Sequence, residues 1–326
     1  MYDFTILILE GAIATGVAVT RDILFAAETL APRVGVAPLK WRLCSVGGGA
    51  LRLQGGMTVE TVKLPAVEPL DRSIWVIPGF GLNTPKAVRR RLDDSDVSQA
   101  IDRLVRHVGM GGEVAAACSA VFMLSAAGLL EGRRATTTWW LAPLLQELAP
   151  GCKVDADRMV WVDGPVTTAG AAFAQTDLML HLLRERSGSP LANLVSRMML
   201  IDGRQSQAPF IIPEVLASGS DLVANVTSRV EAALPNPPSV NELAREFCVS
   251  ERTLSRHIHK ATGKSTVALV QSVRLRRARA LLENSRMTIE QIAAAVGYQD
   301  VTSLRRAMKK STGANPGRFR GAISSM

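Results

Sequence analysis

One cysteine in the first half of the chain stands where a nucleophile could act. The apolar run Val114–Ala117 leads directly into Cys118 and Ser119, and a second apolar stretch, 120–127, follows. This pattern predicts a strand that turns sharply into a helix, with the cysteine at the turn. We expect the turn to expose the thiol and the helix N-terminus to lower its pKa. The alternative is a buried cysteine that serves as a small apolar side chain.

Side chains suited to base recognition recur on two similar stretches near the C-terminus, residues 243–263 and 292–313. If the second half of each stretch is a helix, its apolar residues face inward and polar residues remain on the outer face. Arginine can donate two hydrogen bonds to guanine, so such a face is suited to the major groove of double-stranded DNA. The predicted DNA-binding residues are Arg252, Ser255, Arg256 and His259 in the first copy, and Thr302, Arg305, Arg306 and Lys309 in the second.

Each copy also has the parts of a helix-turn-helix unit. A turn between the two helices needs a positive φ, which suits Gly297 in the second copy and suits Cys248, at the matching position of the first, less well. Short polar residues can cap the helices, twice as a capping box. These capping residues are Ser239 with Glu242, Ser250, Thr288 with Gln291, and Asp300.

A long helix, about 266–284, is predicted between the two copies. Its apolar face consists of Leu275, Ala278, Leu281 and Leu282. Its arginines can either meet DNA phosphates or simply solvate the helix, and they are Arg274, Arg276, Arg277 and Arg279.

Short apolar runs alternate with amphipathic stretches over residues 1–190. This alternation predicts a mostly parallel, doubly wound sheet of the α/β class. The expected strands are Phe4–Leu9, Arg42–Val46, Ile74–Ile77, Val114–Ala117 and Val166–Ala169. The expected helices are 17–31, 97–108, 120–127, 139–148 and 174–186.

The net charge of +9 is confined to the end of the chain. Residues 1–220 contain 21 Lys and Arg and 21 Asp and Glu, whereas residues 221–326 contain 17 and 8. A basic segment of this kind indicates a polyanionic partner. The four cysteines have no metal-like spacing, no basic residue precedes Arg21 as a signal peptide would require, and the apolar run Ala120–Leu130 is too short to span a bilayer. We therefore expect a cytoplasmic protein with no membrane partner, no metal and no cofactor.

The C-terminal residues, 222–326, resemble the DNA-binding domain of the AraC/XylS family. The resemblance rests on the two helix-turn-helix units, the RLxxAxxLL pattern of the helix between them and the closing TGANPGRFR at 312–320. It implies that the two units enter neighbouring major grooves, about 34 Å apart, on one face of the DNA. The chain departs from the family pattern at Leu304 and Met308, where the family usually has phenylalanines.

Residues 3–188 resemble the ThiJ/PfpI superfamily, which has a glutamine-amidotransferase-like, flavodoxin-like fold. The motif at 126–136, with Val76-Ile-Pro-Gly79 and Ala169-Gly170, carries this resemblance. Both resemblances together match the GlxA-type branch of AraC-family regulators.

The superfamily's enzymes pair the cysteine at this turn with a histidine about twenty residues later and often with an acid after the first strand. This chain has Thr138 and Gly16 at those places, although a histidine from another segment, such as His181, could still fold towards the thiol. We expect a binding pocket and no catalysis. The expected ligand-binding residues are Gly79, Phe80, Cys118, Ser119, Thr138 and Trp139, at the carboxyl edge of the sheet where open α/β folds place ligands.

The sequence thus predicts a ligand-sensing or dimerisation domain at 1–200, a linker at 201–221 and a DNA-binding domain at 222–326. The expected function is that of a sequence-specific transcription regulator, an activator in keeping with the resemblance, that responds to a small metabolite. Its expected partners are operator DNA, the small-molecule effector, a second copy in a homodimer and, for an activator, RNA polymerase. Two alternatives remain: an amidase- or hydratase-like cysteine enzyme fused to a DNA-binding domain, and a front domain that only dimerises.

Overall fold

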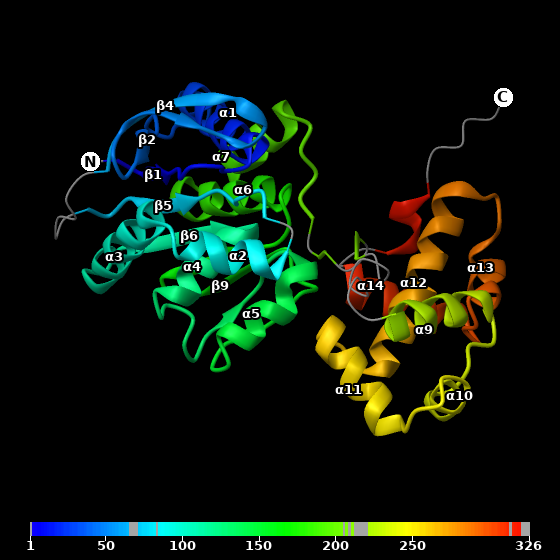
Figure 1. Ribbon diagram of the computed structural model, residues 1–326. Helices are drawn as coiled ribbons and strands as arrows, with labels where there is room; N and C mark the ends of the chain where they lie inside the picture. The colour runs from blue at the N-terminus through cyan, green and yellow to red at the C-terminus, as the bar shows by residue number, and fades with distance from the viewer. Residues whose placement is uncertain are drawn as a thin grey trace. The chain divides into compact units, whose positions relative to one another are not determined.

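The chain forms two units in the computed structural model, residues 1–205 and 206–326 (Figure 1). The structure describes residues 2–64, 71–82, 84–204, 206–207, 210–211, 221–312 and 315–320. Much of the predicted linker, including 212–220, lies outside the described residues.

An eight-stranded sheet in the order β3-β4-β2-β1-β5-β6-β10-β9 forms the centre of the first unit. The five pairings from β4 to β10 are parallel, while β3–β4 and β9–β10 are antiparallel. The predicted doubly wound α/β sheet is confirmed, and the two antiparallel additions were not predicted. The strands are β1 Phe4–Leu7, β2 Trp41–Ser45, β3 Gly49–Arg52, β4 Thr58–Lys63, β5 Ile74–Ile77, β6 Glu113–Ala117, β9 Val160–Asp163 and β10 Val166–Ala169, with a separate pair β7 Arg134–Ala135 and β8 Lys153–Val154.

Helices cover both faces of this sheet (Figure 1). Successive side chains of a strand point to opposite faces, so Phe4 and Ile6 of β1 enter one core and Leu7 enters the other. The first core is closed by α1 Ala14–Leu30, α6 Ala174–Ser187 and α7 Ser189–Met198. The second is closed by α2 Pro85–Leu92, α3 Ser95–Gly109, α4 Val121–Ala126 and α5 Ala142–Leu148. The helix expected at 139–148 begins instead with a 3-10 turn over Trp139–Leu141.

The second unit is helical in its described residues. Its long helix α12 contributes Leu269 and Val273 to one small core and Ala278 and Leu282 to another. One helix thus joins two helix-turn-helix units, each with apolar packing of its own. The helices are α9 Asp221–Ala232, α10 Val240–Glu246, α11 Glu251–Thr262, α12 Thr266–Asn284, α13 Ile289–Ala295 and α14 Val301–Thr312, followed by a 3-10 turn at Pro316–Phe319.

No helix within the described ranges combines the length and the apolar character that crossing a bilayer would require.

Candidate DNA-binding surface and ligand site

The two helix-turn-helix units have the same local construction. Helices α10 and α13 are seven residues long and lie 49 positions apart, while α11 and α14 are twelve residues long and lie 50 apart. Both predicted capping boxes form, and Ser250 and Asp300 accept hydrogen bonds from the backbone amides three residues later. These caps satisfy amides that helix starts leave unpaired, so the helix boundaries follow from local sequence.

The turn between the helices has a left-handed residue in each unit. Cys248 has a φ of 52° and Gly297 a φ of 78°. After each, the chain is tied back to the preceding helix, by Val249 N donating to Ala244 O at 3.0 Å and by Tyr298 N donating to the matching alanine at 2.8 Å. The second turn is one residue longer, which accounts for the change of spacing from 49 to 50.

Seven of the eight predicted DNA-binding side chains lie on exposed positions of α11 and α14. Leu254 and Ile258 face the core from α11, and Leu304 and Met308 do so from α14, so the opposite faces remain open. Those faces carry Arg252, Arg256 and His259 on α11, and Thr302, Arg305, Arg306 and Lys309 on α14.

Ser255 differs from the expectation for the outer face. It is half-buried, and its Oγ lies 3.2 Å from Oγ1 of Thr266, the buried first residue of α12. This contact places the serine beside the helix that follows, so its hydroxyl contributes to packing between α11 and α12.

Arg274 has a structural role that the sequence did not indicate. Its Nε donates to the Val296 carbonyl at 2.8 Å, its Nη2 donates to the Gly297 carbonyl, and its guanidinium lies 4.1 Å from the centre of the Tyr298 ring. The arginine thus holds the turn of the second helix-turn-helix unit against α12, a role that differs from the two considered for it from the sequence.

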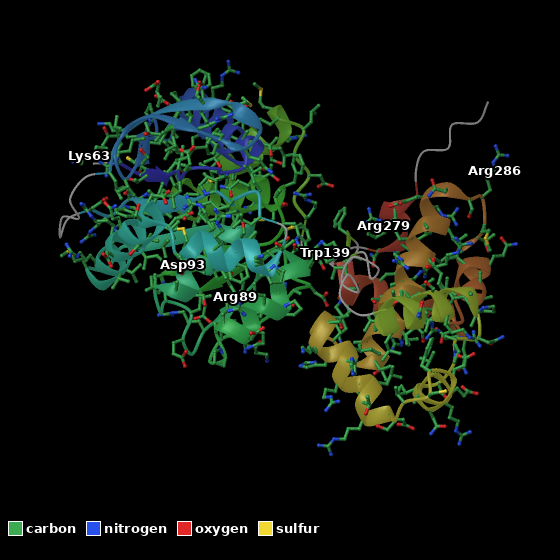
Figure 2. The ribbon with its side chains drawn as sticks, in the orientation of Figure 1. Lys63, Arg89, Asp93, Trp139, Arg279 and Arg286 are labelled. Atoms are coloured by element: carbon green, nitrogen blue, oxygen red, sulfur yellow. The ribbon has the colours of Figure 1, made fainter. Side chains whose placement is uncertain are left out.

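Two further arginines of α12 also make contacts inside the unit. Arg276 forms a 2.9 Å ion pair with Glu231 of α9. Arg279, labelled in Figure 2, pairs with Glu283 and lies 5.0 Å and 5.2 Å from the ring centres of Phe210 and Phe319. Of the four arginines named for this helix, Arg277 is the exposed one.

In the first unit, Cys118 occupies the predicted sharp turn. Its φ of 55° is unusual for a residue with a side chain, and its amide donates to the Gly170 carbonyl at 2.8 Å, which ties the ends of β6 and β10 together. The thiol, however, is only 3% exposed. Burial raises its pKa, and the backbone amide and hydroxyl of Ser119 offset only part of this effect. The expectation of an exposed thiol with a lowered pKa is therefore wrong.

Gly79 and Phe80 pack directly against this turn. A Cβ atom on Gly79 would lie 2.6 Å from the Cβ of Cys118, so only glycine fits there. The Phe80 amide donates to Ser119 Oγ at 3.1 Å, and the same hydroxyl donates to the Phe80 carbonyl at 2.7 Å. These contacts fix the segment after β5 to the 3-10 turn Cys118–Ala120 that precedes α4, although the two segments are about forty residues apart in sequence.

Thr138 and Trp139 complete the set of expected ligand-binding residues. Thr138 is fully buried, and its hydroxyl has no hydrogen bond of normal geometry with the described residues. Trp139 (Figure 2) is 6% exposed and meets Trp140 edge to face, with ring centres 4.9 Å apart. All six expected residues are buried, so a ligand would reach them only from a neighbouring opening.

Neither a catalytic acid nor the possible substitute base is found beside Cys118 among the residues named from the sequence. Gly16 lies in the first turn of α1, where a Cβ would be 3.7 Å from Pro78. His181, the possible substitute base, lines a different hollow with Asp177 and Arg204.

An opening of about 440 Å³ does lie beside Phe80. Arg91 lines it and connects several of the other lining residues: it forms ion pairs of 2.9 Å with Asp94 and 2.6 Å with Asp96, and its guanidinium lies 5.2 Å from the centre of the Phe80 ring. This opening was not predicted from the sequence, although the basic and acidic run at 89–96 was visible. It is lined by Glu10, Gly11, Arg52, Leu53, Phe80, Leu82, Arg91, Asp94 and Asp96.

Comparison with known proteins agrees with this construction. Residues 6–185 match the DJ-1/PfpI family, and residues 243–322 match a helix-turn-helix domain. The chain is similar to the HTH-type transcriptional regulator GlxA of Rhizobium meliloti, with 29% identity over 277 residues that cover 84% of this chain and 82% of the relative. It is also similar to the HTH-type transcriptional regulator CdhR of Pseudomonas aeruginosa, with 27% identity over 98% of this chain and 92% of that one.

Among solved structures, an AraC family transcriptional regulator from Pseudomonas putida shares the fold of the first unit. Its TM-score is 0.51 at 21% sequence identity, and the match covers 61% of this chain and 100% of that one.

The chain belongs to the DJ-1/PfpI family. With the AraC-type helix-turn-helix domain that follows, it is a DNA-binding transcription regulator, as its sequence predicts.

Proposed function

We propose that this regulator reads a two-part operator through the outer faces of α11 and α14 and responds to a small molecule bound by its first unit. The observation that carries the DNA-binding part is the pairing of two equally long helices, each capped by a side chain at its N-terminus, whose exposed faces carry side chains of similar chemistry at matched positions. Arg256 matches Arg306, and His259 matches Lys309, at a spacing of 50 residues.

The helix between the two units supports simultaneous binding. Helix α12 has 19 residues, which corresponds to about 28 Å of helix length. Successive major grooves on one face of DNA lie about 34 Å apart. A rigid helix of this length sets the two recognition helices at a separation close to that of neighbouring grooves.

Substitution of the matched arginines tests the DNA-binding surface. On an operator selected in vitro with the full chain, Arg256→Ala or Arg306→Ala is expected to cost about 1–3 kcal/mol of binding free energy, with much less effect on non-specific DNA. The matched control is Arg286→Ala, an exposed arginine after α12 (Figure 2) that lies outside both recognition helices. If both recognition variants bind the operator as tightly as the control, the DNA-binding faces are wrongly assigned.

The effector site is proposed at the turn that contains Cys118 and at the opening beside Phe80. Two observations support it: the unsatisfied hydroxyl of buried Thr138, which a bound polar group would satisfy, and the opening itself. Arginine and carboxylate side chains both line the opening, which favours an effector with charges of both signs.

A thermal-shift screen of the full chain against amino acids and quaternary amines tests this site. A ligand that binds the folded state raises the melting temperature by mass action. The shift should disappear in Phe80→Trp, which fills the opening, and should persist in Phe25→Trp, which enlarges an exposed side chain of α1. An effector whose shift survives Phe80→Trp would have to bind elsewhere.

A cysteine enzyme is the competing function, and the site gives it little support. The Cys118 thiol is buried with a raised pKa, and Thr138 stands where the base is expected. We therefore propose a non-catalytic domain. Turnover of the effector by the wild-type protein that vanishes in Cys118→Ala would establish the enzyme instead.

The regulator is further proposed to act as a homodimer and, if it activates transcription, to contact RNA polymerase. Sedimentation of the full chain with and without effector tests the first statement. A chain that sediments as a monomer both with and without effector would contradict the proposed homodimer.

A further inference from the structure

A second hollow of the first unit shares no lining residue with the proposed effector site. It encloses about 220 Å³. Its polar lining consists of Arg158, Asp177, His181, Arg184 and Arg204, and Val160, Val162 and Leu180 form an apolar wall. The α6 residues recur at i, i+3, i+4 and i+7, so one face of that helix lines the hollow beside the edge strand β9.

The lining has an excess of positive charge. The lining contains three guanidinium groups and one carboxylate. Arg204 pairs with that carboxylate, its Nη2 lying 2.6 Å and its Nε 3.1 Å from Asp177 Oδ2, and the Arg158 guanidinium lies 5.3 Å from the centre of the Trp161 ring. The Arg184 side chain is exposed and has no hydrogen bond or ion pair in the part of the chain that the structure describes. An excess of two positive charges around a small volume favours a dianion.

The shape and composition of the hollow narrow the class of anion. Its volume is below the roughly 300–1,000 Å³ of most small-molecule sites, so a ligand of only a few non-hydrogen atoms fits. An inorganic anion would make poor contact with the apolar wall of Val160, Val162 and Leu180, whereas the methylene groups of an organic anion would pack against it. His181 has its pKa lowered mainly by burial, so at neutral pH it is a neutral hydrogen-bonding group.

We propose that this hollow binds a small organic dicarboxylate, with its carboxylates toward Arg158 and Arg184 and its methylene groups on the apolar wall. The site goes beyond the proposed effector site and adds a second ligand to the first unit. Gly203 and Arg204 lie at the end of that unit, and the Arg204 amide donates to Asp177 Oδ1 at 2.7 Å. A bound dicarboxylate therefore rests against the residues from which the connection to the DNA-binding unit starts.

Isothermal titration of the full chain with malonate, succinate, glutarate and inorganic phosphate tests this site. At least one dicarboxylate is expected to bind with one site per chain. Arg184→Gln should weaken that binding about tenfold or more, because it removes a charge-assisted contact. The matched control Arg106→Gln changes an exposed arginine of α3, on the other face of the sheet, and should leave binding unchanged.

Three results would overturn the proposal. They are the failure of all three dicarboxylates to bind, binding that Arg184→Gln leaves intact, and phosphate binding as tight as that of the best dicarboxylate. Equal melting temperatures of wild type and Arg184→Gln will show that a loss of binding is not a loss of folding. The DNA-binding face and the opening beside Phe80 take no part in this measurement.

Discussion

At the scale of single residues, Cys118 combines a left-handed backbone with a buried side chain. Its backbone is held by Gly170 on one side and by Gly79 on the other, and the residue is only 3% exposed. Nucleophilic thiol chemistry needs the thiolate, which burial disfavours here. Position at a sharp turn therefore does not by itself make a cysteine reactive.

Alkylation rates test this interpretation. Exposed Cys248 should react with iodoacetamide first, whereas Cys118 should react slowly at pH 8 because its raised pKa keeps it protonated. Cys44 and Cys152, with pKa values of about 11, should behave in the same way. Since a raised thiol pKa delays ionisation, the rates of these buried cysteines should rise only as the pH approaches their pKa or as the fold opens. Mass spectrometry of peptides gives each rate. Labelling of Cys118 as fast as that of Cys248 would contradict the prediction.

The close contact at Gly79 predicts a stability effect. Gly79→Ala should lower the free energy of unfolding of the first unit by about 1–3 kcal/mol, because its Cβ would overlap Cys118 Cβ and crowd the Ala117 carbonyl. All five tryptophans lie in residues 1–205, so their fluorescence in urea reports on this unit. Gly47→Ala is the control, because Gly47 is exposed and has open space at its Cβ position. Equal midpoints for the two variants would show that the sheet edge adapts to the added methyl group.

At the scale of elements, α12 is the part on which both helix-turn-helix units depend. It supplies apolar residues to two separate cores and, through Arg274, two hydrogen bonds to the second turn. Among the described contacts, none of this kind joins an arginine of α12 to the first turn, which contains a strained cysteine where the second has a glycine. The second turn thus has a glycine at its left-handed position, where glycine is unstrained, and is held in addition by the Arg274 side chain.

Loss of that anchor should loosen the second unit locally. Arg274→Ala is expected to lower the opening free energy of α13 and α14 by about 1–3 kcal/mol, because the Val296 and Gly297 carbonyls lose their donor. Hydrogen exchange of residues 289–312 measures this, with exposed Arg277→Ala as the control. Protection of α13 and α14 that matches the control would show that Tyr298 and the core suffice to hold the turn.

At the scale of the whole molecule, the two units have separate apolar cores and separate proposed tasks. The first unit, with 21 Lys and Arg and 20 Asp and Glu in residues 1–205, is close to neutral and carries both proposed ligand sites. The second unit, with 17 Lys and Arg and 9 Asp and Glu, holds most of the excess charge. We therefore expect each unit to fold and to perform its own binding task when it is separated from the other.

A fragment of residues 206–326 should fold and bind DNA by itself. It includes Phe210 and Ile211, of which the first contacts Arg279 and the second is buried. Its affinity should fall steeply with salt, because each neutralised phosphate releases counterions. Circular dichroism establishes folding and fluorescence anisotropy measures binding. A helical fragment without DNA binding at low salt would show that the first unit is needed for DNA binding.

The sequence by itself determined the local features of this protein. Helix α12 matches the predicted 266–284, both capping boxes form, and the repeat spacing locates α11 and α14. The strands β1, β5, β6 and β10 also followed from short apolar runs between helices. Such features depend on side-chain periodicity and on hydrogen bonds between residues three or four apart, so the sequence shows them directly.

Only the tertiary structure decided the rest. The burial of Cys118 depends on Gly79, the position of Ser255 depends on Thr266, and the role of Arg274 depends on carbonyls more than twenty residues away. The hairpin β3–β4 is largely exposed and lacks a continuous apolar run, so no local pattern marked it. The edge strand β9 contains the short run Val160–Val162 but is only partly buried, and it was not predicted from the sequence. Burial and contact are set by which distant segments meet, because a side chain's environment is made by its neighbours in space, and the chain's local preferences do not specify those neighbours.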